Sequence, residues 1–251
     1  MEKRLTSAKI KQIRSLQQKK FRAETSLFTV EGEKMVEEAL ASGFDVESVW
    51  KRDEIGEKDM ARISSFSSPS PILAVLRQKT FSLSDISLEK NRLYLLLDGV
   101  KDPGNLGTII RLADWFGVSA VFCSEDCVEL YNPKTVQATM GAIFRVKVCY
   151  ANLKSIAEEA GKKGIPVFGT FLDGKPLSGS FFQEIEAGGI IVLGSESFGI
   201  SRELSAAIPA EKHILIPSYD IKGKVRKAGT GSESLNVATA CAAILSLVRA
   251  R

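Results

Sequence analysis

Six short apolar runs in the second part of the chain constrain the fold more than any other feature. In each run hydrophobic residues follow one another instead of alternating with polar ones. The runs are LYLLLD (93–98), AVFC (120–123), VKVCY (146–150), IPVFGTF (165–171), IIVLG (190–194) and HILIP (213–217). Such runs are typical of strands that are covered on both faces. Because helical patterns separate several of them, we predict an α/β fold with a mostly parallel sheet and helices on both faces.

A smaller α/β unit is predicted ahead of this sheet. Periodicity and breaker residues predict strands at 28–30, 46–50 and 72–76 and helices at 31–40 and 59–66. The segment FSLSDISLEKN (81–91) is polar with scattered apolar residues and is interpreted as a linker. We therefore place a boundary near residue 88, which gives domains 1–88 and 89–251 in a chain of 251 residues.

The positive charge of the chain is concentrated at its start. Residues 1–22 hold eight Lys and Arg against one Glu, so this segment carries +7 and the rest, with 26 basic and 29 acidic residues, carries −3. A basic segment on a nearly neutral body favours a polyanionic partner such as nucleic acid. The alternative is a solvated helix whose inner side holds Ile10, Ile13 and Leu16. The candidate RNA-binding residues here are Lys11, Arg14, Lys19, Lys20 and Arg22.

Residue usage excludes several kinds of site. The single histidine, His213, argues against histidine-rich zinc sites and against a Ser-His-Asp triad within one chain. Cys123 and Cys127 lack a second cysteine pair nearby, so we expect no metal. The chain has no run of 18 apolar residues, no apolar signal segment and no disulfide-framework spacing, so we expect no membrane association and a reducing, cytoplasmic compartment.

Ligands of open α/β sheets collect at the loops that follow the carboxyl ends of strands. After the first run, we expect Asn105 to cap a helix that opens near Leu106, with Arg111 almost two turns further on. After the fifth run, Gly194 and Gly199 flank Glu196, and a glycine directly after a buried strand allows close approach of a ligand. Each loop taken alone is also compatible with an ordinary turn.

A third loop follows the last run. The polar segment 218–233 leads into the terminal helix SLNVATACAAILSLVRAR, which Ser234 or Asn236 could cap. Two nearby patterns fail as phosphate-binding loops. GTFLDGKP (169–176) has Pro176 where a hydroxyl is needed, and GTGSES (229–234) does not follow a strand. A different nucleotide-binding α/β transferase is therefore a remote alternative.

Five segments, in this order, carry a family resemblance: DPGNLGTIIR (102–111), GAIFRV (141–146), VLGSESFG (192–199), IP (216–217) and SLNVATA (234–240). Together they resemble the SpoU/TrmH family of RNA ribose 2′-O-methyltransferases, part of the SPOUT class, over residues 92–251. The segments 10–40 and 72–76 are similar to the small RNA-binding, substrate-binding domain that precedes the catalytic domain in many members.

The resemblance implies a fold, a cofactor and an assembly. The C-terminal segment would form a trefoil knot, an exception to the usual topology rules, and the protein would be a homodimer with its active site near the dimer interface. S-adenosylmethionine would donate a methyl group to a ribose 2′-hydroxyl of RNA. Its implied binding residues are Thr170, Phe171, Gly194, Ile216 and Leu235.

The resemblance also implies the catalytic set, which consists of Arg111, Asn105, Glu196, Ser234 and Asn236. Family members are proposed to use the matching arginine as the partner of the ribose hydroxyl. Since arginine stays protonated at ordinary pH, orienting a substrate phosphate through its forked donors is the easier role for Arg111. Asn105, Glu196, Ser234 and Asn236 would hold Arg111 and the nucleotide in place.

The N-terminal domain favours ribosomal over transfer RNA as the substrate. The alternatives are a transfer RNA 2′-O-methyltransferase and a non-catalytic RNA-binding protein on the same fold. One departure from the family is the long loop between Pro217 and Ser234. We favour RNA contact over a harmless surface insertion for its basic residues, which are Lys222, Lys224, Arg226 and Lys227.

Overall fold

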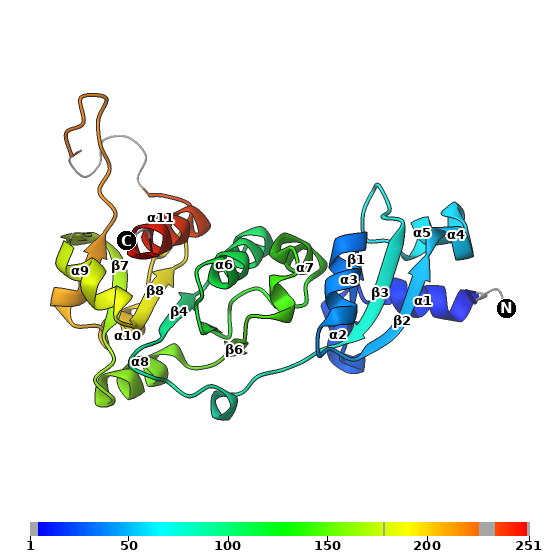
Figure 1. The fold of residues 1–251 in the computed structure, drawn as a ribbon, viewed down its shortest axis with the longest axis horizontal. Coiled ribbons are helices and arrows are strands. Elements are labelled where there is room, and N and C mark those ends of the chain that lie inside the picture. Colours follow the sequence, from blue (N-terminus) through cyan, green and yellow to red (C-terminus); the bar gives the residue numbers. More distant parts are fainter. Residues whose placement is uncertain (1–4, 178, 226–233, 250–251) are drawn as a thin grey trace.

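Two separate β-sheets organise the chain, one in each of two domains (Figure 1). The computed structural model describes residues 5–177, 179–225 and 234–249. The smaller sheet is antiparallel with strand order β1-β3-β2, and the larger has the order β6-β5-β4-β8-β7-β9 with parallel pairing between all neighbours. The larger sheet confirms the prediction that residues from 93 onward form a mostly parallel sheet.

The small domain has two layers of helices around its sheet. Its elements are α1 (Ser7–Ser15), α2 (Lys19–Thr25), β1 (Leu27–Glu31), α3 (Glu33–Ala41), β2 (Val46–Lys51), α4 (Arg52–Ile55), α5 (Glu57–Ile63) and β3 (Ile72–Arg77). Successive side chains of a strand point to opposite faces. Leu73 and Val75 accordingly join the core under α1 and α5, whereas Ala74 and Leu76 join the core that continues into the large domain.

The large domain places helices on both faces of its sheet. Its elements are β4 (Leu93–Asp98), α6 (Pro103–Trp115), β5 (Ala120–Cys123), α7 (Pro133–Thr139), η2 (Ala142–Phe144), β6 (Val148–Tyr150), α8 (Leu153–Lys162), β7 (Val167–Pro176), α9 (Gly179–Glu186), β8 (Gly189–Gly194), α10 (Arg202–Ser205), η3 (Ala210–Lys212), β9 (His213–Leu215) and α11 (Val237–Arg249). Leu95 and Leu97 of β4 pack with α6 and α11, while Tyr94 and Leu96 pack with α8 and α10 (Figure 1). In the described segments, no helix is both long and apolar enough to cross a membrane.

Two expectations about element boundaries were wrong. Helix α6 begins at Pro103 because Asp102 is its N-cap and accepts a hydrogen bond from the Asn105 amide at 2.8 Å. Strand β7 continues to Pro176, beyond the predicted end at 171, because a register shift lets β9 pair with two stretches of it.

The connection between the sheets is packed, although its sequence predicted only a polar linker. It contains the short helix η1 (Leu83–Asp85), which begins with a capping box between Ser82 and Asp85. Ile86 and Leu88 are buried in the core between the sheet and α8. The connection therefore anchors to the large domain before β4 begins.

Arg22 joins the two domains and corrects the expectation that it contacts RNA. Only 3% of its surface is exposed. Its guanidinium forms an ion pair with Glu129 of the large domain and donates a hydrogen bond to the Leu16 carbonyl oxygen at 2.7 Å. A buried charge is held in this way only when it is paired. Arg22 therefore has no exposed donor to offer a phosphate.

Two further contacts fix the domains against each other. Arg145 of the large domain forms ion pairs with Glu38 of α3, at 2.5 Å, and with Asp114 of α6, at 2.8 Å. Hydrogen bonds to these two carboxylates, with the larger effect from Asp114, raise the pKa of the Arg145 guanidinium. The Tyr131 hydroxyl donates to the Lys79 carbonyl oxygen at 2.6 Å and accepts from the Lys79 amide at 2.9 Å. Burial raises the pKa of Tyr131 to about 12, so the hydroxyl keeps its proton at neutral pH.

We expect the variant Glu129→Ala to lower the free energy of unfolding by about 3 kcal/mol, because it leaves the Arg22 charge buried and unpaired. Urea denaturation measures this difference. The control is Glu125→Ala, since Glu125 is an exposed carboxylate on the same loop. Equal stability of the two variants would show that the Arg22–Glu129 pair does not hold the domains together.

Candidate active site

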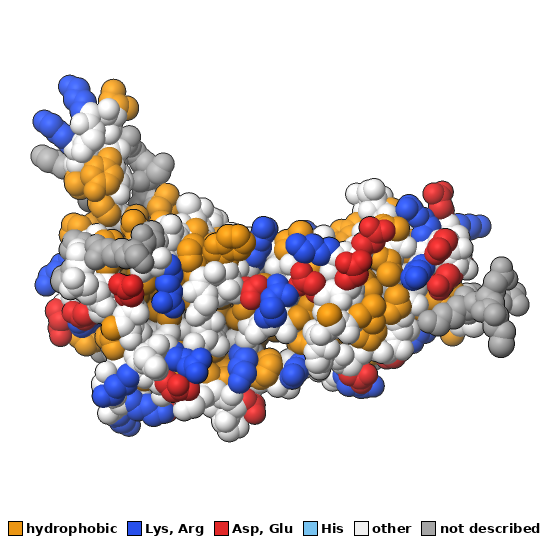
Figure 2. All heavy atoms as spheres, in the orientation of Figure 1, with side chains coloured by type: hydrophobic (Ala, Val, Ile, Leu, Met, Phe, Trp, Pro, Cys, Tyr) orange, Lys and Arg blue, Asp and Glu red, His pale blue; other side chains and the backbone are white. Residues whose placement is uncertain are grey.

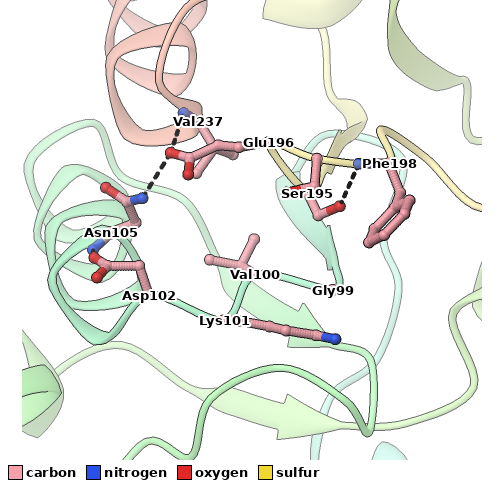
Figure 3. A pocket seen from close by; sticks show the side chains of 10 residues that line it. Gly99, Val100, Lys101, Asp102, Asn105, Ser195, Glu196, Phe198 and Val237 are labelled. Atoms are coloured by element: carbon pink, nitrogen blue, oxygen red, sulfur yellow. Dashed lines mark hydrogen bonds between the residues drawn. The ribbon is translucent and has the colours of Figure 1, made fainter.

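One carboxylate oxygen connects three segments that are far apart in the sequence. Oε1 of Glu196, in the loop after β8, accepts a hydrogen bond from Asn105 Nδ2 at 2.8 Å (Figure 3). It also accepts one from Asn236 Nδ2 at 2.6 Å. The Val237 amide, at the start of α11, lies 3.5 Å from the same oxygen. Asn236 Nδ2 also donates to Asn105 Oδ1 at 3.0 Å. We call Asn105, Glu196 and Asn236 the polar cluster.

Local capping explains why both asparagine side chains reach Glu196. Because Asp102 caps α6, Asn105 is not the cap, and its amide group is free to donate to Glu196. Asn236 fulfils the predicted role of cap for α11. Its Oδ1 accepts from the amides of Ala238 at 3.0 Å and Thr239 at 3.2 Å, which leaves Nδ2 for the cluster.

The loop that carries Glu196 is a tight and well-supported turn. Ser195 and Gly199 exchange two backbone hydrogen bonds, of 3.0 and 2.9 Å. A Cβ on Gly194 would lie 2.1 Å from the backbone carbon of Gly199, so only glycine fits there. Asp98, at the end of β4, accepts from the Ser201 amide at 2.7 Å. Sequence reasoning missed the role of Asp98, although its place at the end of the first strand was a signal.

The loop after β4 faces the loop that carries Glu196. It is held by hydrogen bonds to the turn that follows β5. The Gly99 amide donates to Ser124 Oγ at 2.9 Å, and the Val100 amide donates to Cys127 Sγ at 3.2 Å. A hydrogen bond from Cys123, with further ones from Ser124 and Val100, lowers the pKa of Cys127 to about 7 despite burial, which acts in the opposite direction.

A cavity of about 90 Å³ opens between these loops (Figure 3). Its walls come from the loop after β4, the loop after β8, and the first residues of α6 and α11. The lining residues are Gly99, Val100, Lys101, Asp102, Asn105, Ser195, Glu196, Ser197, Phe198 and Val237. The cavity holds carboxylates, amide groups and a lysine beside apolar walls, a mixture typical of a site that orients a polar ligand.

Four of the five expected cofactor residues lie near one edge of the sheet, at the carboxyl ends of β8 and β9 and just beyond the stretch of β7 that pairs with β8, whereas Leu235 lies before α11. The Thr170 hydroxyl donates to the Val192 carbonyl oxygen at 3.1 Å, and Gly194 is the last residue of β8. Phe171 is half-buried and stacks on His213 with ring centroids 3.9 Å apart. Ile216 is also half-buried, whereas Leu235 is 48% exposed.

Two members of the expected catalytic set lie apart from the polar cluster. Arg111 is exposed on α6, six residues beyond Asn105, and forms no ion pair with any described residue. Six residues correspond to about 9 Å along a helix and to a different face. Ser234 is exposed just before Asn236. A single chain therefore brings together Asn105, Glu196 and Asn236 but not Arg111.

Most of the expected RNA-binding residues are exposed. Lys11, Arg14, Lys19 and Lys20 lie on the surface of the small domain. Lys222 and Lys224 lie on a hairpin closed by a bridge between Tyr219 and Val225, and this hairpin projects from the large domain (Figure 2). Arg226 and Lys227 fall outside the described residues.

Comparisons with known proteins agree with this architecture. The sequence model of the SpoU rRNA Methylase family matches residues 92–246, and that of the MRM3-like substrate binding domain matches residues 7–85. The 23S rRNA (guanosine(2553)-2′-O)-methyltransferase RlmP of Bacillus subtilis is 31% identical over 258 residues, covering 96% of each chain.

Two solved structures are similar over nearly the whole chain. An AdoMet-bound rRNA methyltransferase from Sinorhizobium meliloti has a TM-score of 0.82 at 30% identity, covering 99% of this chain and 97% of that one. A structure from Porphyromonas gingivalis assigned to the TrmH family has a TM-score of 0.80 at 34% identity, covering 98% of each chain. The family model alone spans more than half of the sequence, and the chain belongs to the SpoU rRNA methylase family.

Proposed function

We propose that this protein transfers a methyl group from S-adenosylmethionine to a ribose 2′-hydroxyl of 23S rRNA. The observation that carries the proposal is the polar cluster, in which Glu196, in the loop after β8, connects the start of α6 to the start of α11. The relative RlmP, similar over 96% of its length, is named for this reaction on 23S rRNA. We also propose a reducing, cytoplasmic compartment, which its four buried cysteines without a disulfide support.

The edge formed by β7, β8 and β9 fits S-adenosylmethionine. Phe171 and Ile216 offer half-buried apolar surface for an adenine ring, and backbone groups at Thr170 and Gly194 can read its polar edge. Leu235, exposed beside the polar cluster, would cover the cofactor. When bound, S-adenosylmethionine would supply an electrophilic methyl group on a sulfonium cation, and Glu196, two residues beyond Gly194, would contribute negative charge to this part of the site.

The chain's own residues can position the ribose. Asn105 and Asn236 are oriented by Glu196, so their position is fixed before RNA arrives. Arg111 is exposed and donates no hydrogen bond to any described residue, so its forked guanidinium is suited to bind the phosphate next to the reacting ribose. In-line alignment of oxygen and methyl carbon can supply much of the acceleration in such a transfer.

We further propose that two copies of the chain associate through α6 and α11. Trp115 is 80% exposed on α6, one turn from Arg111 and on the same face. Leu247 of α11 is 47% exposed, and Arg249 of the same helix donates to the Phe116 carbonyl oxygen at 3.1 Å, so the ends of the two helices are adjacent. Exposed apolar patches of this kind mark interaction surfaces. The dimer would bring Arg111 to the polar cluster of the partner subunit.

The experiment for the proposed function measures methyl transfer from S-adenosylmethionine to a 23S rRNA transcript, with nucleoside analysis of the product by mass spectrometry. We expect one 2′-O-methylnucleoside and one S-adenosylmethionine site per chain by calorimetry. Arg111→Ala should lower the transfer rate by roughly 100-fold, the size of effect seen for positioned catalytic groups, and leave the affinity for RNA nearly unchanged.

The control is Arg92→Ala, since Arg92 is an exposed arginine at the opposite, amino end of β4. A base-methylated product would contradict the proposed reaction. RNA binding without cofactor binding or transfer would establish a non-catalytic RNA-binding protein. Transfer by Arg111→Ala at the parental rate would remove Arg111 from the catalytic set.

The dimer is tested by light scattering. We expect the parent protein to have twice the 27.3 kDa mass of the chain, and Trp115→Glu to have the mass of one chain, because a charge in an apolar interface is costly to bury. Leu40→Glu is the control, since Leu40 is an exposed apolar residue on α3 of the small domain. A parental monomer, or a dimeric Trp115→Glu, would refute this interface.

A further inference from the structure

The ring of Phe198 is more exposed than any other aromatic side chain in the described segments. It is 86% exposed and lies in the same turn as Glu196. Burying a phenylalanine side chain is worth roughly 1.5–3 kcal/mol, so a ring left in water contributes nothing to the stability of the fold. Its place beside the polar cluster suggests that it contacts a ligand.

The backbone of this turn holds the ring in a defined position. The Phe198 amide donates to Ser195 Oγ at 3.1 Å, and the turn is closed by the two hydrogen bonds between Ser195 and Gly199. Gly199 has a φ of +66°, in the left-handed region that favours glycine. The aromatic side chain is therefore presented by a turn that three hydrogen bonds close.

Phe198 belongs to the rim of the cavity that contains the polar cluster. Figure 3 shows its ring on one side of the cavity and Glu196 and Asn105 on the other. Lys101 comes from the facing loop, and its side chain extends below Gly99. Lys101 is 71% exposed and 4.0 Å from Asp126, a contact too long and too solvated to neutralise it strongly. The rim thus combines an aromatic face with a cation.

We propose that Phe198 stacks on an unpaired nucleobase of the RNA next to the methylated ribose, with Lys101 near the adjoining phosphate. Single-stranded RNA is recognised by stacking of splayed bases on aromatic side chains, and stacking tolerates any base. The inference rests on the proposed function, because a base stacked at this rim belongs to the nucleotide whose ribose enters the cavity or to its neighbour.

The first test measures the affinity for a 23S rRNA transcript and the kinetic constants of methyl transfer. Phe198→Ala should raise the Kd for RNA and the KM roughly tenfold, the effect of one lost base stack, while calorimetric binding of S-adenosylmethionine stays at the parental value. Phe198→Trp should restore both constants, because it returns an aromatic face. The matched control is Leu83→Ala, which removes an exposed apolar side chain from η1, outside the cavity.

The second test detects stacking directly. In Phe198→Trp, binding of the 23S rRNA transcript should quench indole fluorescence beyond the change seen in the parent, whose tryptophans are Trp50 and Trp115. A ring that only supports the turn would give no additional quenching. This readout does not depend on turnover.

Three results would overturn the inference. One is a parental Kd and KM in Phe198→Ala, in a protein whose parent methylates RNA. Another is the absence of additional quenching in Phe198→Trp. The third is a change of mass by light scattering in Phe198→Ala that accounts for its loss of affinity, which would identify the ring as part of a contact between two copies. Failure of the parent to transfer methyl groups at all would instead reject the proposed function.

Discussion

The candidate site depends on the hydrogen bonds that the carboxylate of Glu196 accepts. Asn105, Glu196 and Asn236 lie in three different segments, and backbone pairing alone does not join their side chains. Hydrogen bonds to a charged acceptor are worth about 1.5–3 kcal/mol each, more than those between neutral groups. Two such bonds to one oxygen, which solvent weakens, add to the core packing of α6 and α11 in placing the starts of both helices relative to the loop after β8. The cavity exists because these three segments are held together.

The fixed arrangement of the two domains determines how an RNA molecule can contact the protein around this site. The Arg22–Glu129 pair, the Arg145 bridge and the Tyr131–Lys79 contacts hold the small domain against the large one. With the domains fixed, the small domain and the projecting hairpin of the large domain lie toward opposite ends of the molecule (Figure 1). A long polyanion that contacted both the small domain and the hairpin would also run along the large domain. Its affinity would fall steeply with increasing salt concentration. The fixed geometry therefore favours structured RNA over a short single strand.

The sequence predicted the sheet well because its signal is local. Continuous apolar runs such as LYLLLD report burial on both faces, and every predicted run became a strand of the large sheet. Arg22 was placed wrongly because its partner Glu129 is 107 residues away, and charge density cannot distinguish a buried arginine from an exposed one. Asn105 was placed wrongly as a cap because Asp102, three residues earlier, is an equally good one. The trefoil knot, which concerns chain threading, stays a prediction from the family.

The role of Glu196 in assembling the site is tested most directly by the methyl-transfer rate of Glu196→Gln, compared with that of the parent protein. A thermal denaturation curve of each protein first establishes that both are folded. Glutamine keeps the shape of the side chain and one acceptor oxygen but loses the negative charge, so the hydrogen bonds from Asn105 and Asn236 become weaker bonds between neutral groups. We expect a loss of at least roughly tenfold in rate, which corresponds to about 1.4 kcal/mol. Transfer by Glu196→Gln at the parental rate would contradict the claim that this carboxylate assembles the active site.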